Sequence, residues 1–217
     1  MKIISKKTFL KEKEKYFDLF KKGKVFIYPT DTIYGLGCDA LKEKAVEKII
    51  RMKERKNKPM SIIAPNKEWI KENCILNKNA EKWMKKLPGK YTLIMNLKNK
   101  KSISNLVNQK HDVPPCFKTG THALDAQDTC QVSRHNNQES LGVRIPKNWF
   151  AKILEEYSNP FVTTSVNLTG EKPMSSLKDL NNKVKRRVDY LIYEGKITGK
   201  PSTIVDLRNE EKVMKRD

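Results

Sequence analysis

Two cations near the end of a helix, and a third just after it, are the first residues whose chemistry stands out. Lys53 and Arg55 close a helix expected over 43–53, and Lys58 enters the following loop. Such a cluster suits a polyanionic ligand. Cations also suit the negative end of a helix dipole, so a solvated helix terminus explains them equally well. The cluster alone does not decide between these interpretations.

Hydroxyl and amide side chains form the second group with chemical potential. The segment 163–167 (Thr-Thr-Ser-Val-Asn) follows an apolar strand that a proline precedes, and Ser202 and Thr203 stand before another apolar run. Polar side chains at the carboxyl end of a strand can line a ligand crevice. The same residues can instead cap the turn that follows. Both interpretations stay open at this point.

Residues 35–40 spell GxGxxA between a strand and a helix, as in dinucleotide-binding proteins. Five residues separate the end of the strand from Gly35, so the turn is not tight. No acidic residue follows the next strand to hold a ribose. A GxxxxGK[ST] phosphate loop is also missing from the sequence. A dinucleotide site is therefore disfavoured.

The segment 109–140 contains all the histidines and half of the cysteines. Histidine and cysteine together can bind zinc, but their spacing here never reaches the close CxxC or HxxxH step. From 111 to 140 there are two cations and four acids, a net charge of −2 in a chain of +20. The segment also lacks apolar periodicity. We expect a surface insertion near the mouth of a cleft, and no metal site. The residues concerned are His111, His122, His135, Cys116 and Cys130.

Elements that would position these residues alternate along the chain. Strands are predicted at 25–28, 60–64, 91–97, 141–145, 161–164, 188–193 and 203–207, with a short one at 212–214. Helices are predicted at 8–22 with Thr8 as its cap, and at 43–53, 67–73, 78–86, 148–157 and 176–186. The region from Thr30 to Leu41 is predicted to be a loop. Alternating strands and helices indicate an α/β domain on a mixed sheet.

Length and composition limit the class of protein. The 217 residues fit one domain, and no apolar run approaches the roughly 20 residues of a membrane span. The four cysteines are scattered, and the N-terminus has no apolar signal region, so we expect a reducing, cytoplasmic location. Lys and Arg number 45 against 25 acids. That charge suits a polyanionic partner or simply reflects a lysine-rich composition.

Six blocks, in order, resemble one known family. They are YPTDTIYGLG at 28–37, KER at 53–55 with Lys58-Pro59, LPGKYTLI at 87–94, LGVRIP at 141–146, TSVNLTG at 164–170, and Glu194-Gly195 through Gly199 to STIVD at 202–206. Any one block is weak, but the ordered set covers nearly the whole chain. The sequence resembles the YrdC/Sua5 family, the threonylcarbamoyl-AMP synthases, in the form without an extra C-terminal domain.

The resemblance implies a fold and a reaction. The fold is a twisted mixed parallel and antiparallel sheet with helices on its faces, as one domain over 1–217 with the atypical insertion at 109–140. The enzyme is a nucleotidyltransferase that forms threonylcarbamoyl-AMP and pyrophosphate from L-threonine, bicarbonate and ATP, with Mg²⁺ expected alongside ATP. The product would pass to a tRNA threonylcarbamoyl transferase complex, and no membrane partner is implied.

The resemblance also assigns residues. Lys53 and Arg55 would be catalytic, holding the phosphates and offsetting charge on the leaving pyrophosphate. Arg144 offers a fork for the threonine carboxylate. The remaining threonine-binding residues would be Thr32, Thr163 and Ser202; the nucleotide-binding residues would be Lys53, Arg55, Lys58, Ser140, Ser165, Asn167 and Arg216.

A protein of the same fold that binds double-stranded RNA or tRNA without synthase activity is the alternative, and it would use the +20 charge. Strong salt dependence of RNA binding would favour it. It leaves the combined matches at Lys53, Arg144 and Asn167 unexplained. A relative that carbamoylates another acceptor is a third interpretation.

Overall fold

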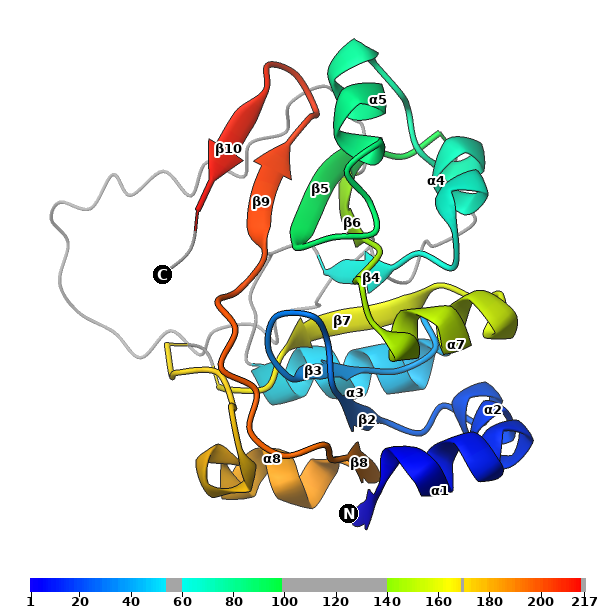
Figure 1. The fold of residues 1–217 in the computed structure, drawn as a ribbon, viewed down its shortest axis with the longest axis vertical. Coiled ribbons are helices and arrows are strands. Elements are labelled where there is room, and N and C mark those ends of the chain that lie inside the picture. The colour runs from blue at the N-terminus through cyan, green and yellow to red at the C-terminus, as the bar shows by residue number, and fades with distance from the viewer. Residues whose placement is uncertain (54–59, 99–139, 169, 216–217) are drawn as a thin grey trace, which may run out of the picture.

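The computed structural model describes residues 1–53, 60–98, 140–168 and 170–215, and within them ten strands form one mixed sheet (Figure 1). Strand pairs β1–β8, β2–β8, β4–β6 and β5–β9 are parallel and the other five are antiparallel. The order across the sheet is β1 (Lys2–Ile4), β8 (Tyr190–Ile192), β2 (Phe26–Tyr28), β3 (Gly35–Gly37), β7 (Phe161–Ser165), β4 (Ser61–Ile63), β6 (Ser140–Arg144), β5 (Tyr91–Asn96), β9 (Thr203–Asp206) and β10 (Lys212–Met214). The predicted mixed α/β architecture is confirmed.

Helices cover both faces of the sheet and divide the core into two clusters. One face packs against α3 (Glu43–Lys53), α4 (Lys67–Asn73), α5 (Lys78–Met84) and α8 (Asn182–Arg187), through aliphatic side chains of alternate strand residues such as Ile62, Val143 and Val162. The opposite face packs against α1 (Lys6–Lys11), α2 (Lys13–Lys21) and α7 (Trp149–Tyr157). Alternation of side chains along each strand separates the two clusters.

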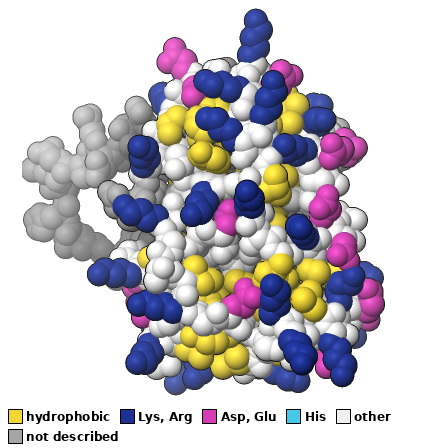
Figure 2. Space-filling model, viewed as in Figure 1, with side chains coloured by type: hydrophobic (Ala, Val, Ile, Leu, Met, Phe, Trp, Pro, Cys, Tyr) yellow, Lys and Arg dark blue, Asp and Glu magenta, His cyan; other side chains and the backbone are white. Residues whose placement is uncertain are grey.

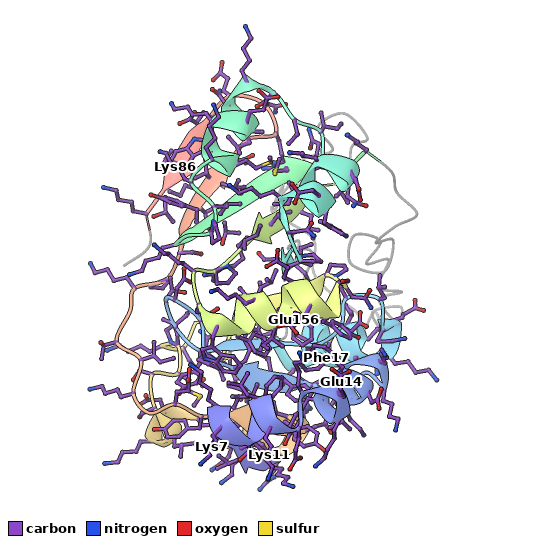
Figure 3. The ribbon with its side chains drawn as sticks, turned by 45° about the vertical axis from the view of Figure 1, so that its right-hand side comes forward. Lys7, Lys11, Glu14, Phe17, Lys86 and Glu156 are labelled. Carbon is purple, nitrogen blue, oxygen red and sulfur yellow. The ribbon has the colours of Figure 1, made fainter. Side chains whose placement is uncertain are left out.

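The second cluster is dominated by aromatic rings, and we call it the aromatic cluster. Tyr28 stacks on Phe150 with ring centroids 4.4 Å apart, and Phe20 meets Phe26 edge-on at 4.7 Å. Helices α2 and α7 lie side by side over it, and an ion pair between Lys13 and Glu156 joins them (Figure 3). The aromatic cluster covers only part of its face of the sheet, between β1 and β7 and as far as Ile63 on β4.

Several predicted elements are wrong in detail. The helix expected at 8–22 is two helices that meet at Glu12, whose φ of −112° is not helical, and Ser5 rather than Thr8 caps the first. The region 176–186 is a 3₁₀ turn, Leu177–Asp179, followed by α8. Strands β1 and β3 were not predicted, because each is short and β3 is rich in glycine.

Strand β3 explains the GxG motif without a dinucleotide. Gly35 and Gly37 pair with β2, and Gly35 also pairs with β7, instead of forming a phosphate-binding turn. A Cβ on Gly35 would lie 2.7 Å from the ring of Tyr28, and one on Gly37 only 1.8 Å from the carbonyl oxygen of Val162. The glycines therefore let β3 pass against an aromatic ring and a neighbouring strand.

Other predictions fall partly or wholly outside the described ranges. These include the insertion at 109–140, apart from Ser140, and with it the five histidines and cysteines weighed as zinc ligands. Cys38 and Cys74, which are described, are buried free thiols. None of the helices in the described ranges combines the length and the hydrophobicity that a membrane span requires.

Candidate functional site

The face that carries the aromatic cluster becomes polar beyond it. Ser61 on β4 lies opposite Thr163 on β7 and opposite Gly142 on β6. Directly opposed residues share a face, so these three form a row across the sheet. Phe161, two residues before Thr163, shares that face but packs in the aromatic cluster. One strand therefore passes from an apolar core to a polar surface within two residues.

A small cavity of about 110 Å³ opens on this polar surface. Liquid water occupies roughly 30 Å³ per molecule, so the cavity suits a ligand the size of a few waters. All four residues predicted to bind threonine line it, although they come from distant parts of the chain. The lining residues are Thr30, Thr32, Ile33, Tyr34, Gly35, Ser61, Thr92, Arg144, Thr163, Thr164, Ser165 and Ser202.

Hydrogen bonds between hydroxyl groups hold the walls of the cavity. Thr92 and Ser202 lie 2.7 Å apart, oxygen to oxygen, and join β5 to the segment that leads into β9. Thr30 and Thr32 lie 2.9 Å apart, and the Thr30 hydroxyl donates to the carbonyl of Ile33 at 2.6 Å. These contacts fix hydroxyl groups around the cavity before any ligand arrives.

Gly142 makes room for two lining residues of the cavity, Ser61 and Thr92. A Cβ there would lie 2.5 Å from the Ser61 hydroxyl and 3.2 Å from the Thr92 methyl carbon. Tyr34 closes another side: its hydroxyl donates to the carbonyl of Gly195 at 2.7 Å and accepts from the amide of Glu194. Burial raises the pKa of Tyr34 to about 12, so the phenol stays neutral near pH 7.

Arg144 is the charged group of the cavity. Its side chain is buried, and one amino group donates to Asp31 at 2.7 Å and lies 3.4 Å from the Thr32 hydroxyl. Burial lowers the pKa of the guanidinium, and the nearby Asp31 charge opposes that shift. Its Nε is buried and has no hydrogen-bond partner among the residues that the structure describes. A buried unpaired donor is unfavourable until an acceptor binds.

Lys53 gathers a second group of predicted residues. This last residue of α3 is buried because the apolar side of that helix packs into the aliphatic core. Its ammonium donates to the carbonyls of Ser165 and Asn167 at 2.9 and 2.6 Å, and to the Asn167 side-chain oxygen at 2.6 Å. Ser165 donates to the same side-chain oxygen at 2.6 Å. Lys53, Ser165 and Asn167 thus form one cluster, which Ser165 connects to the cavity.

The remaining predicted residues are not all placed. Ser140 begins β6 opposite Asn96, on the same face as Gly142, but is not among the residues lining the cavity. Arg55, Lys58 and Arg216 lie outside the described residues. Among the described residues, no group of three or more His, Cys, Asp or Glu could hold a metal ion.

Among the lining or supporting residues that sequence reasoning missed are Thr30, Asp31, Ser61 and Thr92. Thr30, Asp31 and Thr92 stood inside the matched blocks without a role, and Ser61 stood in a strand that was read only as apolar. Their proximity to the site follows from strand pairing and a buried ion pair. No local signal in the sequence marks either feature.

Lysine and arginine side chains spread over the whole of one face of the molecule rather than gathering in one dense patch (Figure 2). Acidic residues are interspersed among them, and apolar side chains show between them. The net charge of +20 is therefore a weak guide to where a polyanion binds.

Comparisons with known proteins agree with this fold. The family model Sua5_yciO_yrdC, whose description is telomere recombination, matches residues 18–217. A Methanocaldococcus jannaschii protein with the provisional name threonylcarbamoyl-AMP synthase is 32% identical over 214 residues, 95% of this chain and 87% of the relative.

Two solved structures share the fold. The crystal structure of E. coli YciO has a TM-score of 0.72 at 24% identity and covers 93% of this chain and 87% of its own. P. abyssi Sua5 in complex with L-threonine has a TM-score of 0.70 at 22% identity. It covers 95% of this chain, which in turn spans 54% of that longer protein.

Proposed function

Because the chain belongs to the Sua5/YciO/YrdC family, we propose that it is a threonylcarbamoyl-AMP synthase. The reaction joins L-threonine, bicarbonate and ATP and releases pyrophosphate, which makes the enzyme a nucleotidyltransferase. One observation carries this proposal: Thr32, Arg144, Thr163 and Ser202 converge on one cavity of about 110 Å³. A ligand carboxylate would pair with the guanidinium of Arg144, which lines the cavity, and the surrounding hydroxyls would bind the rest of a small polar ligand.

The cluster of Lys53, Ser165 and Asn167 supports a nucleotide next to this cavity. Ser165 belongs both to the cluster and to the lining, so a ligand in the cavity would lie beside the cluster. A buried ammonium at this point favours a negatively charged neighbour. Arg55, Lys58, Ser140 and Arg216 complete the proposed nucleotide set. Mg²⁺ enters as the counter-ion of ATP, and no step is assigned to a metal held by the protein.

The proposed chemistry needs positioning more than acid–base catalysis. The threonine amine and bicarbonate form a carbamate and water, and a carbamate oxygen then attacks the α-phosphorus of ATP. A phosphorus–oxygen bond forms, the bond to the β-phosphate oxygen breaks, and pyrophosphate leaves with the electron pair. Arg144 would fix the carboxylate, while Lys53 and Arg55 would offset charge on the phosphates.

Pyrophosphate release tests the proposal directly. We expect release from MgATP only when threonine and bicarbonate are both present, and a nucleotide product that carries the threonine carbons. Serine in place of threonine, and bicarbonate-free buffer, are the matched controls. Release that ignores threonine would contradict the assigned substrate and favour a relative that carbamoylates another acceptor.

Delivery of the product defines the proposed partners. The adenylate would pass to a tRNA threonylcarbamoyl transferase complex, and the reducing, cytoplasmic location expected from the cysteines stays a prediction. A proximity assay with and without substrates would test for such a complex.

RNA binding without synthase chemistry is the second candidate, and one feature favours it. A groove of about 270 Å³ between α3 and α8 is lined by Lys44, Lys48, Arg51 and Arg187 and by a single acid, Glu47. The three cations of α3 stand at i, i+4 and i+7, on one side of the helix over about 10 Å of its length. We name these residues the α3–α8 groove. Its described lining holds no apolar side chain, so it suits a phosphate backbone better than a lipid surface.

The salt dependence of tRNA binding shows whether the α3–α8 groove binds RNA or whether cations all over the surface do so. Changing Lys44 and Arg187 to Gln should weaken tRNA binding and lower the slope of log affinity against log salt by about one per lost phosphate contact. Lys7 and Lys11, exposed on α1, supply the matched control pair (Figure 3). If substitution of Lys7 and Lys11 weakens tRNA binding as much as substitution of Lys44 and Arg187, the groove is not a specific RNA site. Tight RNA binding together with no pyrophosphate release would favour this candidate over the synthase.

A further inference from the structure

Asp31 is the acidic partner of the cavity, and nothing in the matched motifs gives it a role. It lies between β2 and β3, and its side chain is buried. Each carboxylate oxygen has its own donor. Oδ1 accepts from an Arg144 amino group at 2.7 Å, and Oδ2 accepts from the backbone amide of Lys147 at 2.9 Å.

This arrangement fixes the carboxylate at both ends. The Lys147 amide belongs to the segment that follows Arg144, and the carbonyl of Ile145 in that segment accepts from the amide of Gly89. Asp31 therefore ties one amino group of Arg144 to a stretch of backbone that is itself held in place. A guanidinium held at one corner has little freedom to rotate.

Asp31 occupies only part of the guanidinium group of Arg144. Arg144 has five N–H donors, and Asp31 takes one of its amino groups. Nε stays buried without a partner among the described residues, although the side chain lines the cavity. An acid that occupied the whole fork would block the cavity to a second carboxylate. Asp31 engages only one edge of the fork.

We propose that Asp31 is a positioning residue that holds Arg144 by one amino group and so presents the rest of its guanidinium to the carboxylate of an amino-acid ligand. This inference rests on the proposed function of the cavity. Asp31 acts through Arg144 and does not touch the ligand. It also keeps the pair of side chains neutral overall, which suits an amino acid in its zwitterionic form better than a simple carboxylic acid.

Direct binding of threonine tests the role of Asp31 without any turnover. Calorimetry would compare L-threonine with L-threoninol, which lacks the carboxylate, in wild type and in Asp31→Asn. We expect Asp31→Asn to weaken threonine binding about tenfold while threoninol binding changes little. Asp206→Asn is the matched control, because Asp206 pairs with Arg208 away from the cavity lining. It should leave the ratio of the two affinities unchanged.

A double-mutant cycle tests whether Asp31 acts through Arg144. In an Arg144→Lys background, Asp31→Asn should weaken threonine binding by less than about twofold, because the group it positions is gone. Additive losses would overturn the proposal. If Asp31→Asn fails to fold, Asp31→Ser removes the same charge with a smaller side chain, and the same results are expected.

Failure of this inference and failure of the proposed function look different. If wild type binds threonine but Asp31→Asn lowers only the melting temperature and keeps the preference for threonine over threoninol, Asp31 is merely structural. If wild-type protein binds no threonine at all, the proposed function fails and the role of Asp31 fails with it.

Discussion

Arg144 and Lys53 are both cations withdrawn from solvent, with 6% and 4% of their surface exposed, yet they are bound in different ways. Lys53 donates to three oxygens of the segment 165–167, none of which carries a formal charge. Arg144 shares a carboxylate with a backbone amide and retains a buried, unpartnered Nε within the described chain.

This difference shows how the two halves of the site are built. The Arg144 side is ready for an anion, since its hydroxyl walls and its guanidinium are held by contacts that leave the cavity open. On the Lys53 side the cation is engaged with protein oxygens. A phosphate would have to share or replace these contacts, because an ammonium has three donors. We expect threonine affinity to depend on Arg144 and ATP affinity to depend on Lys53.

Arg144→Lys should give the largest effect. Lysine keeps the charge but loses the planar fork, so threonine binding should weaken about 100-fold, which corresponds to about 3 kcal/mol. Calorimetry with threonine measures it. Arg208→Lys is the control, because Arg208 also pairs with an aspartate, Asp206, but does so away from the cavity lining. If Arg144→Lys left the threonine affinity unchanged, Arg144 would not be the group that binds threonine, and the contrast with Lys53 would fail.

Lys53→Met should affect the half of the site that is proposed to bind the nucleotide. The three oxygens lose their shared donor, so the protein should lose about 2 kcal/mol of stability and kcat/KM for ATP should fall about tenfold. Threonine affinity should stay within about twofold of wild type. Lys48→Met, on the same helix and paired with Asp189, is the control. An equal loss of threonine and ATP binding in Lys53→Met would show that the two halves act as one unit.

Gly142→Ala tests whether the volume of the cavity beside Arg144 limits threonine binding. The added methyl would force the Ser61 hydroxyl away and press on Thr92, so the cavity should shrink. We expect KM for threonine to rise about fivefold, near 1 kcal/mol, with KM for ATP unchanged. Steady-state kinetics with each substrate varied in turn would measure both. A smaller effect for serine than for threonine would show that the lost volume is occupied by the threonine methyl group.

Asp179→Asn should give the smallest effect, on the segment that follows Asn167. The Asp179 carboxylate accepts from the amides and hydroxyls of Ser175 and Ser176, which lowers its pKa to about 2. Because the folded-state pKa lies below the unfolded value of about 3.9, the charged form stabilises the fold above that pH. This contribution is lost as the pH falls through about 2.

Urea unfolding at several pH values checks this last prediction. The midpoint of wild type should exceed that of Asp179→Asn by a similar small amount at pH 7 and pH 5, and the gap should narrow as the pH falls from about 4 towards 2. KM for ATP should change less than about twofold. If the difference in urea midpoint between wild type and Asp179→Asn grew in acid, hydrogen bonds to the charged carboxylate would not be the cause of the lowered pKa of Asp179.

Much of this protein follows from the sequence alone. Apolar periodicity and caps predict most of the helices and strands, because burial of one face is a local property of the pattern. The ordered blocks also predict that Thr32, Arg144, Thr163 and Ser202 bind one ligand, and the structure shows that all four line one cavity. The split of the first helix at Glu12 and the strand at 35–37 escape this reasoning, because tertiary packing overrides weak local preference there.

Tertiary structure alone decides how the site is assembled. Ser61 joins Thr163 and Gly142 only because β4 pairs with β7 and β6 in one register, and a shift by one residue would turn Ser61 to the opposite face. Asp31 reaches Arg144 across more than a hundred residues of sequence, through a buried ion pair that no periodicity encodes. Arg144 lines a cavity and is paired with one carboxylate, whereas Lys53 is bound by oxygens of its own chain, and this difference depends on which groups the fold brings within hydrogen-bonding distance.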